Sequence, residues 1–140
     1  MIQHHGCLLD TNVLVYSADL ADVKKQDRAS AIIKEAMQKR KDYAISTQAL
    51  TEFANVALKK LHMAPEIVMD YLQFFESITT IVPDTALVRR GVEIKALYGI
   101  QFYDAMMVAA AERAEAAELW SEDLNNGQSY CGIRVRNPFC

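Results

Sequence analysis

Short apolar runs alternate along this chain with longer segments in which apolar residues recur every three or four positions. The runs are typical of buried strands, and the longer spacing is typical of amphipathic helices. The runs predict strands at residues 7–9, 43–46, 78–82, 118–120 and 133–135. The spacing predicts helices after residue 10 and over residues 29–37, 50–61, 65–75, 87–98 and 103–111. Because strands and helices alternate, we predict an α/β fold with a central parallel sheet of about five short strands and helices on both faces.

Polar residues mark where several of these elements begin and end. Asn12 and Thr47 are placed to cap the helices that follow the first two strands. The polar stretch at residues 20–27 precedes the second helix, and Gly99 is a typical residue at which a helix stops. The helix over 103–111 is apolar nearly all round, which predicts that it is buried among neighbouring elements.

Composition is that of one globular domain, which we expect to span residues 1–140. The chain is 51% hydrophobic and 24% charged, and 140 residues suffice for a proper core. Its formal net charge of −3 gives no general attraction to nucleic acid, so RNA or DNA binding would need a local basic group or a metal ion.

Cysteine usage and hydropathy bear on location. Cys7, Cys131 and Cys140 form no CxxC pair, which favours a reduced, cytoplasmic protein without a zinc finger. We expect neither a signal sequence nor a membrane-spanning segment. His4 and His5, near the start of the chain, are expected to face solvent rather than bind metal.

Four carboxylates fall where strands end or helices begin. Asp10 follows the first strand, Asp123 follows the fourth, and Glu52 and Asp104 lie in the opening turns of their helices. Taken singly, Glu52 is explained as a solvated acid, Asp104 as a helix cap and Asp123 as part of a turn. Taken together, they are predicted to meet at the carboxyl edge of a parallel sheet, where such folds bind ligands. Clustered carboxylates repel unless cations neutralise them, and hard oxygen ligands favour Mg²⁺ or Mn²⁺.

At these positions the sequence resembles the PIN-domain (PilT N-terminus) ribonucleases, most closely the VapC-type toxins of toxin–antitoxin pairs. The resemblance covers nearly the whole chain and rests on four motifs in order. They are LLDTNVLVYS with Asp10 and Asn12, QALTEFANVAL with Glu52, FYDAMMVAAA with Asp104, and SEDLNNGQ with Ser121 and Asp123, and the closing IRVRNPF also fits.

The resemblance implies an endoribonuclease that depends on Mg²⁺, or on Mn²⁺ in its place, and hydrolyses RNA phosphodiester bonds. It implies Asp10, Glu52, Asp104 and Asp123 as the catalytic, metal-binding residues. It further implies a small antitoxin as partner and a homodimer. Asp10 and Asp104 are the expected direct ligands, while Glu52 and Asp123 would act as a ligand through water, as the base that orients water, or at a second metal.

Two supporting residues and one departure complete the expected site. Asn12 and Ser121 are expected to orient the carboxylates and the attacking water. Many relatives carry a further aspartate two places after the fourth acid, and here that position is Asn125, so the number of metal ions stays open. Single-stranded or looped RNA is the expected substrate, because its exposed backbone reaches such a pocket without melting a duplex.

Three other functions are alternatives for this sequence. A haloacid-dehalogenase-type phosphatase would need an aspartate where Asn12 stands. A non-catalytic interaction module on the same fold would be expected to have lost some of the four acids. A PIN nuclease of RNA processing, or one that acts on DNA, remains open, although small solitary domains look more like toxins.

Overall fold

The computed structural model describes residues 6–140, so His4 and His5 lie outside the described part of the chain. These residues form a six-stranded sheet in the order β3-β2-β1-β4-β6-β5. The strands are β1 Cys7–Leu9, β2 Tyr43–Ser46, β3 Thr79–Ile81, β4 Glu118–Trp120, β5 Ser129–Tyr130 and β6 Ile133–Arg136. All neighbours pair in parallel except β5, which is antiparallel to β6. The predicted α/β fold is confirmed, with β5 as the strand that the sequence pattern did not predict.

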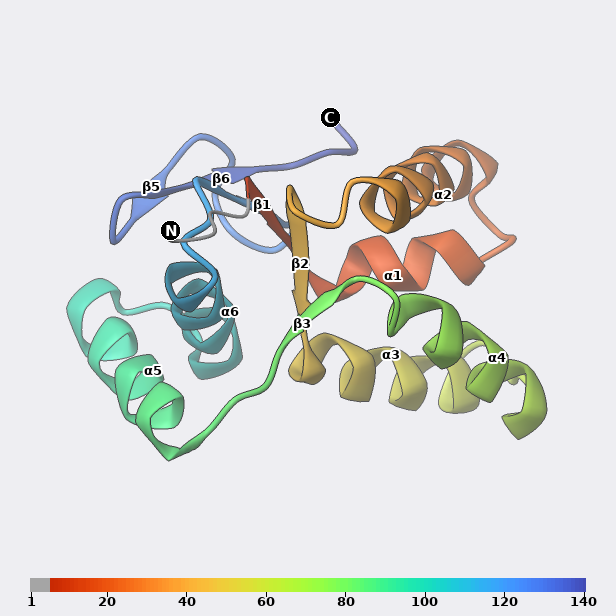
Figure 1. The fold of residues 1–140 in the computed structure, drawn as a ribbon, viewed down its shortest axis with the longest axis horizontal. Coiled ribbons are helices and arrows are strands. Elements are labelled where there is room, and N and C mark those ends of the chain that lie inside the picture. Colours follow the sequence, from red (N-terminus) through yellow and green to blue (C-terminus); the bar gives the residue numbers. More distant parts are fainter. Residues whose placement is uncertain (1–5) are drawn as a thin grey trace.

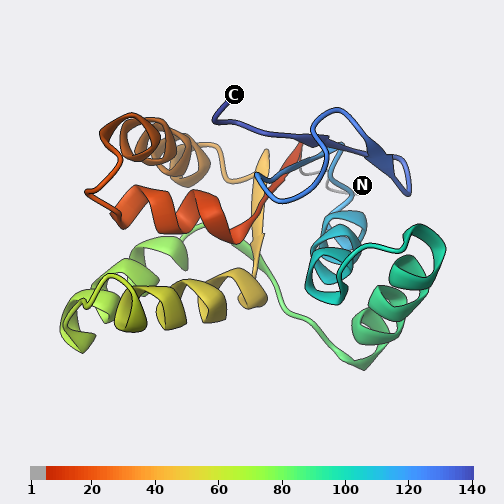
Figure 2. The same ribbon diagram turned by 180° about the vertical axis from the view of Figure 1, so that it is seen from behind.

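Six helices surround the sheet. They are α1 Thr11–Ala18, α2 Val23–Gln38, α3 Thr47–Lys59, α4 Pro65–Phe75, α5 Thr85–Tyr98 and α6 Phe102–Arg113. Figure 1 shows α5 and α6 on one side of the sheet and α1 to α4 on the other, and the reverse view in Figure 2 agrees. The prediction of helices on both faces is therefore confirmed.

The second helix begins earlier than its apolar spacing predicted. It starts at Val23, inside the stretch expected to precede it, and the Asp22 side chain accepts a hydrogen bond from the Lys25 backbone N–H at 3.1 Å. This cap satisfies one of the free amides of the first turn. The polar residues of that stretch are therefore the solvent-facing start of α2.

Two helix caps also differ from expectation. Asp10, not Asn12, caps α1, and its side chain accepts from the Thr11 backbone N–H. Ser46, not Thr47, caps α3, because its hydroxyl accepts from the Gln48 backbone N–H at 3.2 Å. Asp10 directly follows β1, and Ser46 is the last residue of β2. Each helix therefore begins closer to the end of its strand than expected.

The core lies around the central strands and α6. Every residue of β1 and β2 is buried, and so is the run from Ala105 to Ala111 in α6. The prediction that this helix is buried among neighbours is confirmed. Its many alanines let it lie close to the strands, because small side chains permit close approach. Among residues 6–140, no helix is long and apolar enough to cross a membrane.

Candidate active site

Asp10 is held at the carboxyl end of β1 by bonds to both of its carboxylate oxygens. Its backbone N–H donates to the carbonyl of Trp120 at 3.0 Å, which joins the ends of β1 and β4. Its Oδ1 accepts from the Thr11 backbone N–H at 2.7 Å, and its Oδ2 accepts from the Ser121 hydroxyl at 2.6 Å. Asp10 is 3% exposed, so this carboxylate is fixed in position and almost removed from solvent.

The loop after β4 is tied to the same carboxylate. Ser121 is fully buried, and its hydroxyl oxygen also accepts from the Asp123 backbone N–H at 3.1 Å. From α1, the Asn12 side-chain oxygen accepts from the Glu122 backbone N–H at 3.4 Å. Asn12 and Ser121 thus fix the loop that carries Asp123 relative to Asp10.

Three acids from three elements meet at this edge of the sheet. Asp10 follows β1, Asp123 follows β4, and Asp104 lies in the first turn of α6. One carboxylate oxygen from each lies within 4.8 Å of the others. The parallel pairing of β1 with β4 places the first two side by side, and Asp104 brings the start of α6 to the same edge.

Glu52 lies outside this group of three. It stands in the second turn of α3 rather than in the opening turn that the sequence suggested. Its carboxylate accepts hydrogen bonds from the Thr11 hydroxyl and, at 3.2 Å, from the Gln48 side-chain amide. Its charge nevertheless acts on Asp104, because it contributes to the raised pKa of that carboxyl.

Burial and like charges set the electrostatics of the cluster. Burial raises the pKa of Asp10 to about 6; the bonds from Ser121 and Thr11 oppose this rise, and the charges of Asp123 and Asp104 add to it. The pKa of Asp104 is also raised, first by burial and then by the charges of Asp123 and Glu52. Burial is thus the larger cause of both pKa shifts, and the like charges of the neighbouring acids add to it.

The donor set fits a divalent cation. All three clustered groups are carboxylates, and such hard oxygen donors suit Mg²⁺ or Mn²⁺. Within residues 6–140, no lysine or arginine forms an ion pair with Asp10, Asp104, Asp123 or Glu52. The described residues therefore provide negative charge at this edge without an ion pair that balances it.

Three residues that the sequence did not single out hold the loop from its other side. The Tyr16 hydroxyl donates to Glu122 Oε1 at 2.8 Å, and Lys25 Nζ pairs with Glu122 Oε2 at 3.0 Å. Lys25 also donates to the Tyr16 hydroxyl at 3.1 Å. Glu122 could have been noticed as the neighbour of Asp123, but Tyr16 and Lys25 come from α1 and α2, and no sequence signal links them to it.

A groove of about 600 Å³ opens beside the cluster, between α1 and α3. Two of the acids, Glu52 and Asp123, line the groove, and Asn55 and Lys60 line it farther along α3. Polar groups that can bind a substrate therefore continue beyond the cluster itself.

Comparison with known proteins gives one family and several similar folds. The model of the PIN domain matches residues 7–125. The DNA-bound VapBC structure from Salmonella typhimurium is 20% identical, with a TM-score of 0.68, and the match covers 97% of this chain and 99% of that one. A toxin-antitoxin complex from Klebsiella pneumoniae is 21% identical, with a TM-score of 0.64 and coverage of 95% and 98%.

A third similar structure is Mycobacterium tuberculosis VapC20, described as a sarcin-ricin loop cleaving toxin. It is 11% identical to this chain, with a TM-score of 0.68, and the match covers 92% of this chain and 99% of that one. The comparison with curated proteins finds no match. At these identities the solved structures establish a shared fold.

Proposed function

This chain belongs to the PIN-domain family, and on that basis we propose that it is a metal-dependent endoribonuclease that acts as the toxin of a toxin–antitoxin pair. The observation that carries this proposal is the meeting of Asp10, Asp104 and Asp123 at the carboxyl edge of the sheet, with oxygens within 4.8 Å of one another. A cluster of carboxylates that forms no ion pair with a basic residue of 6–140 suits phosphodiester hydrolysis assisted by a divalent cation.

Asp10 and Asp104 are the proposed direct ligands of Mg²⁺, or of Mn²⁺ in its place, and Asp123 completes the group. When bound, the cation would make a water more acidic and offset the negative charge of the phosphate. Ser121 and the Thr11 backbone N–H each bond one oxygen of Asp10, so the orientation of this carboxylate is already fixed before it would bind a cation.

Glu52 is proposed to orient the attacking water and accept its proton. Bonds from Thr11 and Gln48 fix its carboxylate at the edge of the groove. Asn12 and Ser121 keep Asp123 in register with Asp10. Among the described residues, the one histidine, His62, follows the far end of α3, so a carboxylate is the better candidate for the base.

Cleavage of a mixed RNA pool by the purified protein tests this function. We expect cleavage in Mg²⁺ and in Mn²⁺, none in chelator, and none by an Asp10→Asn variant. Asp27→Asn is the matched control, because it removes an equal charge from an exposed position on α2. If folded protein cuts no RNA in either metal, a non-catalytic interaction module becomes the better reading, and cleavage of DNA alone would favour a DNA-directed nuclease.

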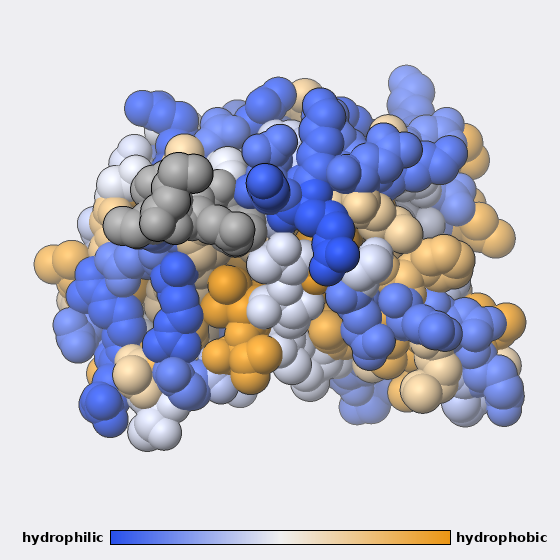
Figure 3. All heavy atoms as spheres, in the orientation of Figure 1, coloured by the Kyte–Doolittle hydropathy of each residue, from blue (hydrophilic) through white to orange (hydrophobic). Residues whose placement is uncertain are grey.

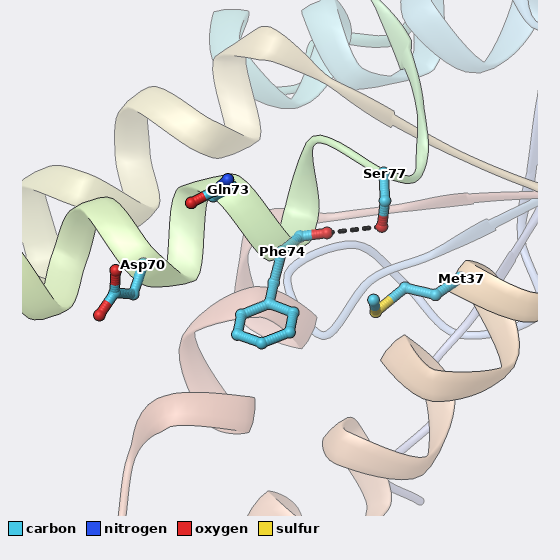
Figure 4. A pocket seen from close by; sticks show the side chains of 5 residues that line it. All are labelled: Met37, Asp70, Gln73, Phe74 and Ser77. Atoms are coloured by element: carbon cyan, nitrogen blue, oxygen red, sulfur yellow. Dashed lines mark hydrogen bonds between the residues drawn. The ribbon is translucent and has the colours of Figure 1, made fainter.

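The proposed antitoxin has a candidate docking surface away from the acids. Two adjoining hollows of about 380 and 490 Å³ lie between α2 and α4, and both are lined by Met37 and Phe74. Figure 4 shows Met37 pointing toward Phe74, a residue that is 60% exposed. Apolar surface also extends between these helices in Figure 3. Similar folds occur in toxin–antitoxin complexes, which supports an apolar antitoxin segment as the occupant.

A second copy of the chain is the other proposed partner, and the cytoplasm is the proposed location. Exposed apolar side chains on α5, among them Val92 and Leu97, support self-association because such groups gain from being covered. Sedimentation equilibrium of the purified protein tests it: we expect the mass of a dimer, and a monomer at all concentrations would contradict the proposal.

A further inference from the structure

We propose that the groove between α1 and α3 binds the single-stranded RNA segment next to the scissile phosphate. In this arrangement Lys60 contacts a backbone phosphate and Asn55 contacts a nucleotide base. The inference rests on the proposed ribonuclease function and adds to it the path of the substrate. It begins from the fact that Glu52 and Asp123 line the same groove as Asn55 and Lys60.

The spacing along α3 places these residues on one face. Asn55 and Val56 follow Glu52 by three and four positions, and Lys60 follows Val56 by four. Residues three or four apart are neighbours on a helix surface. At 1.5 Å per residue, Lys60 stands roughly 12 Å along the axis from Glu52. A strand whose phosphate lies at the acids can therefore follow α3 to the lysine.

Charge favours a phosphate at Lys60. The groove is also lined by Asp19, Glu52 and Asp123, and Lys60 is the one basic residue among the described residues that line it. Within residues 6–140, no ion pair or side-chain hydrogen bond engages the Lys60 ammonium. Because the whole chain carries a net charge of −3, RNA must be attracted locally, and this unpaired cation offers that attraction.

Asn55 adds a group that can read a base. It is exposed, and its amide offers both a donor and an acceptor, which suits the edge of an unpaired base. A phosphate contact gives affinity without sequence preference, whereas a base contact gives preference. Substitution of Lys60 is therefore expected to weaken binding of every RNA sequence, whereas substitution of Asn55 is expected to change the sequence preference.

Lys60→Ala tests the phosphate contact, with Lys59→Ala as its matched control. Both lysines are exposed and adjacent, but Lys59 does not line the groove. With a fluorescein-labelled single-stranded RNA of randomised sequence, Lys60→Ala should raise KM roughly fivefold and leave kcat unchanged, as expected for a contact equally strong in ground and transition states. The slope of log KM against log salt should fall by about 1. Lys59→Ala should match the wild type.

Two further variants of groove residues are expected to have effects other than a raised KM. Asp19→Asn removes a repelling charge and keeps the acceptor for the Ala21 backbone N–H, so it should lower KM. Asn55→Ala should change the distribution of cut sites in the randomised RNA more than the total rate. If Lys60→Ala equals Lys59→Ala in KM and in salt slope, the proposed path is wrong.

Binding by fluorescence anisotropy, in an Asp10→Asn background that blocks cleavage, separates this inference from the proposed function. Weaker RNA binding by Lys60→Ala than by Lys59→Ala would support RNA binding in the groove, even if the wild-type protein does not cut RNA. Cleavage by wild-type protein with equal binding by both lysine variants leaves the ribonuclease standing and overturns the path. Loss of a protein partner alone in Lys60→Ala would likewise overturn it.

Discussion

At the scale of single residues, folding and chemistry make opposite demands on Asp10. Its position at the end of β1 buries the carboxylate and raises its pKa to about 6. Metal binding needs the ionised form, which burial disfavours. The bonds from Ser121 and the Thr11 backbone recover part of this cost. The metal-free protein is therefore expected to be less stable at neutral pH than a version without this charge.

The pH dependence of folding tests that cost in chelator. Because the folded pKa of Asp10 lies above its ordinary value of 3.8, its protonation stabilises the fold, fully below about 3.8 and progressively less as pH rises through about 6. The shift corresponds to roughly 2–3 kcal/mol. Asp10→Asn should therefore unfold at higher urea than wild type at pH 8, with a smaller difference at pH 5. Asp27→Asn should show no such gain, and a less stable Asp10→Asn at pH 8 would refute the assignment.

Ser121 should matter for metal binding through the two bonds that it makes. Ser121→Ala removes the donor to Asp10 Oδ2 and the acceptor of the Asp123 backbone N–H. Groups that orient metal ligands typically change metal affinity tenfold or more when removed. We expect Mn²⁺ affinity, measured by electron paramagnetic resonance, to fall roughly tenfold.

Ser17→Ala is the control for that titration. The Ser17 hydroxyl also donates at 2.6 Å, but to the Leu14 carbonyl within α1 and away from the acids. Unchanged Mn²⁺ affinity in Ser121→Ala, with the fold intact by circular dichroism, would remove Ser121 from the proposed site.

At the scale of elements, the sequence predicted those strands and helices that have a clear apolar pattern. The strands that form the centre of the sheet are short apolar runs, and their bounds agree with β1, β2 and β4. The start of α2 was missed because its first turns carry no buried residues, so the sequence shows no apolar period there. β5 was missed because two residues show no period; its hairpin depends on positive φ angles at Cys131 and Gly132.

The candidate site was predictable to the same extent. Asp10, Asp104 and Asp123 could be placed at one edge because strand ends and helix starts share that edge in a parallel sheet. The strand order that puts β4 beside β1 could not be read from the pattern. The contact of Lys25 with Glu122 could not be either, because it depends on how α2 packs against the rest of the chain.

Packing between α5 and α6 sets where Asp104 lies, and Gly91 permits it. A Cβ atom at Gly91 would stand 2.6 Å from the sulfur of Met106. We expect Gly91→Val to lower the free energy of unfolding by about 1–3 kcal/mol, the usual cost of overpacking. Met106→Ala in the same chain should recover part of that loss, as a double-mutant cycle by urea unfolding would show. A fully stable Gly91→Val would mean that the Met106 side chain can move aside without cost, and that Gly91 is not needed for this packing.

At the scale of the whole molecule, the acids and the apolar hollows lie on different surfaces. The acids gather at the carboxyl edge of β1 and β4, whereas Met37 and Phe74 line the space between α2 and α4. No residue lines both the groove beside the acids and these hollows, among the lining residues of the described chain. Catalysis and antitoxin binding should therefore be separable by mutation.

Phe74→Glu tests that separation. The variant places a charge where an apolar antitoxin segment is proposed to dock, and burying an unpaired charge is costly. Co-expressed with the product of a neighbouring short reading frame, Phe74→Glu should lose the partner on co-purification, while RNA cleavage by the isolated protein stays at the wild-type rate. Leu20→Glu is the matched control, because Leu20 is also an exposed apolar residue, lies in the turn between α1 and α2, and lines neither hollow. If both variants retain the partner, docking lies elsewhere; if Phe74→Glu also stops cleavage, the two surfaces are coupled and the separation fails.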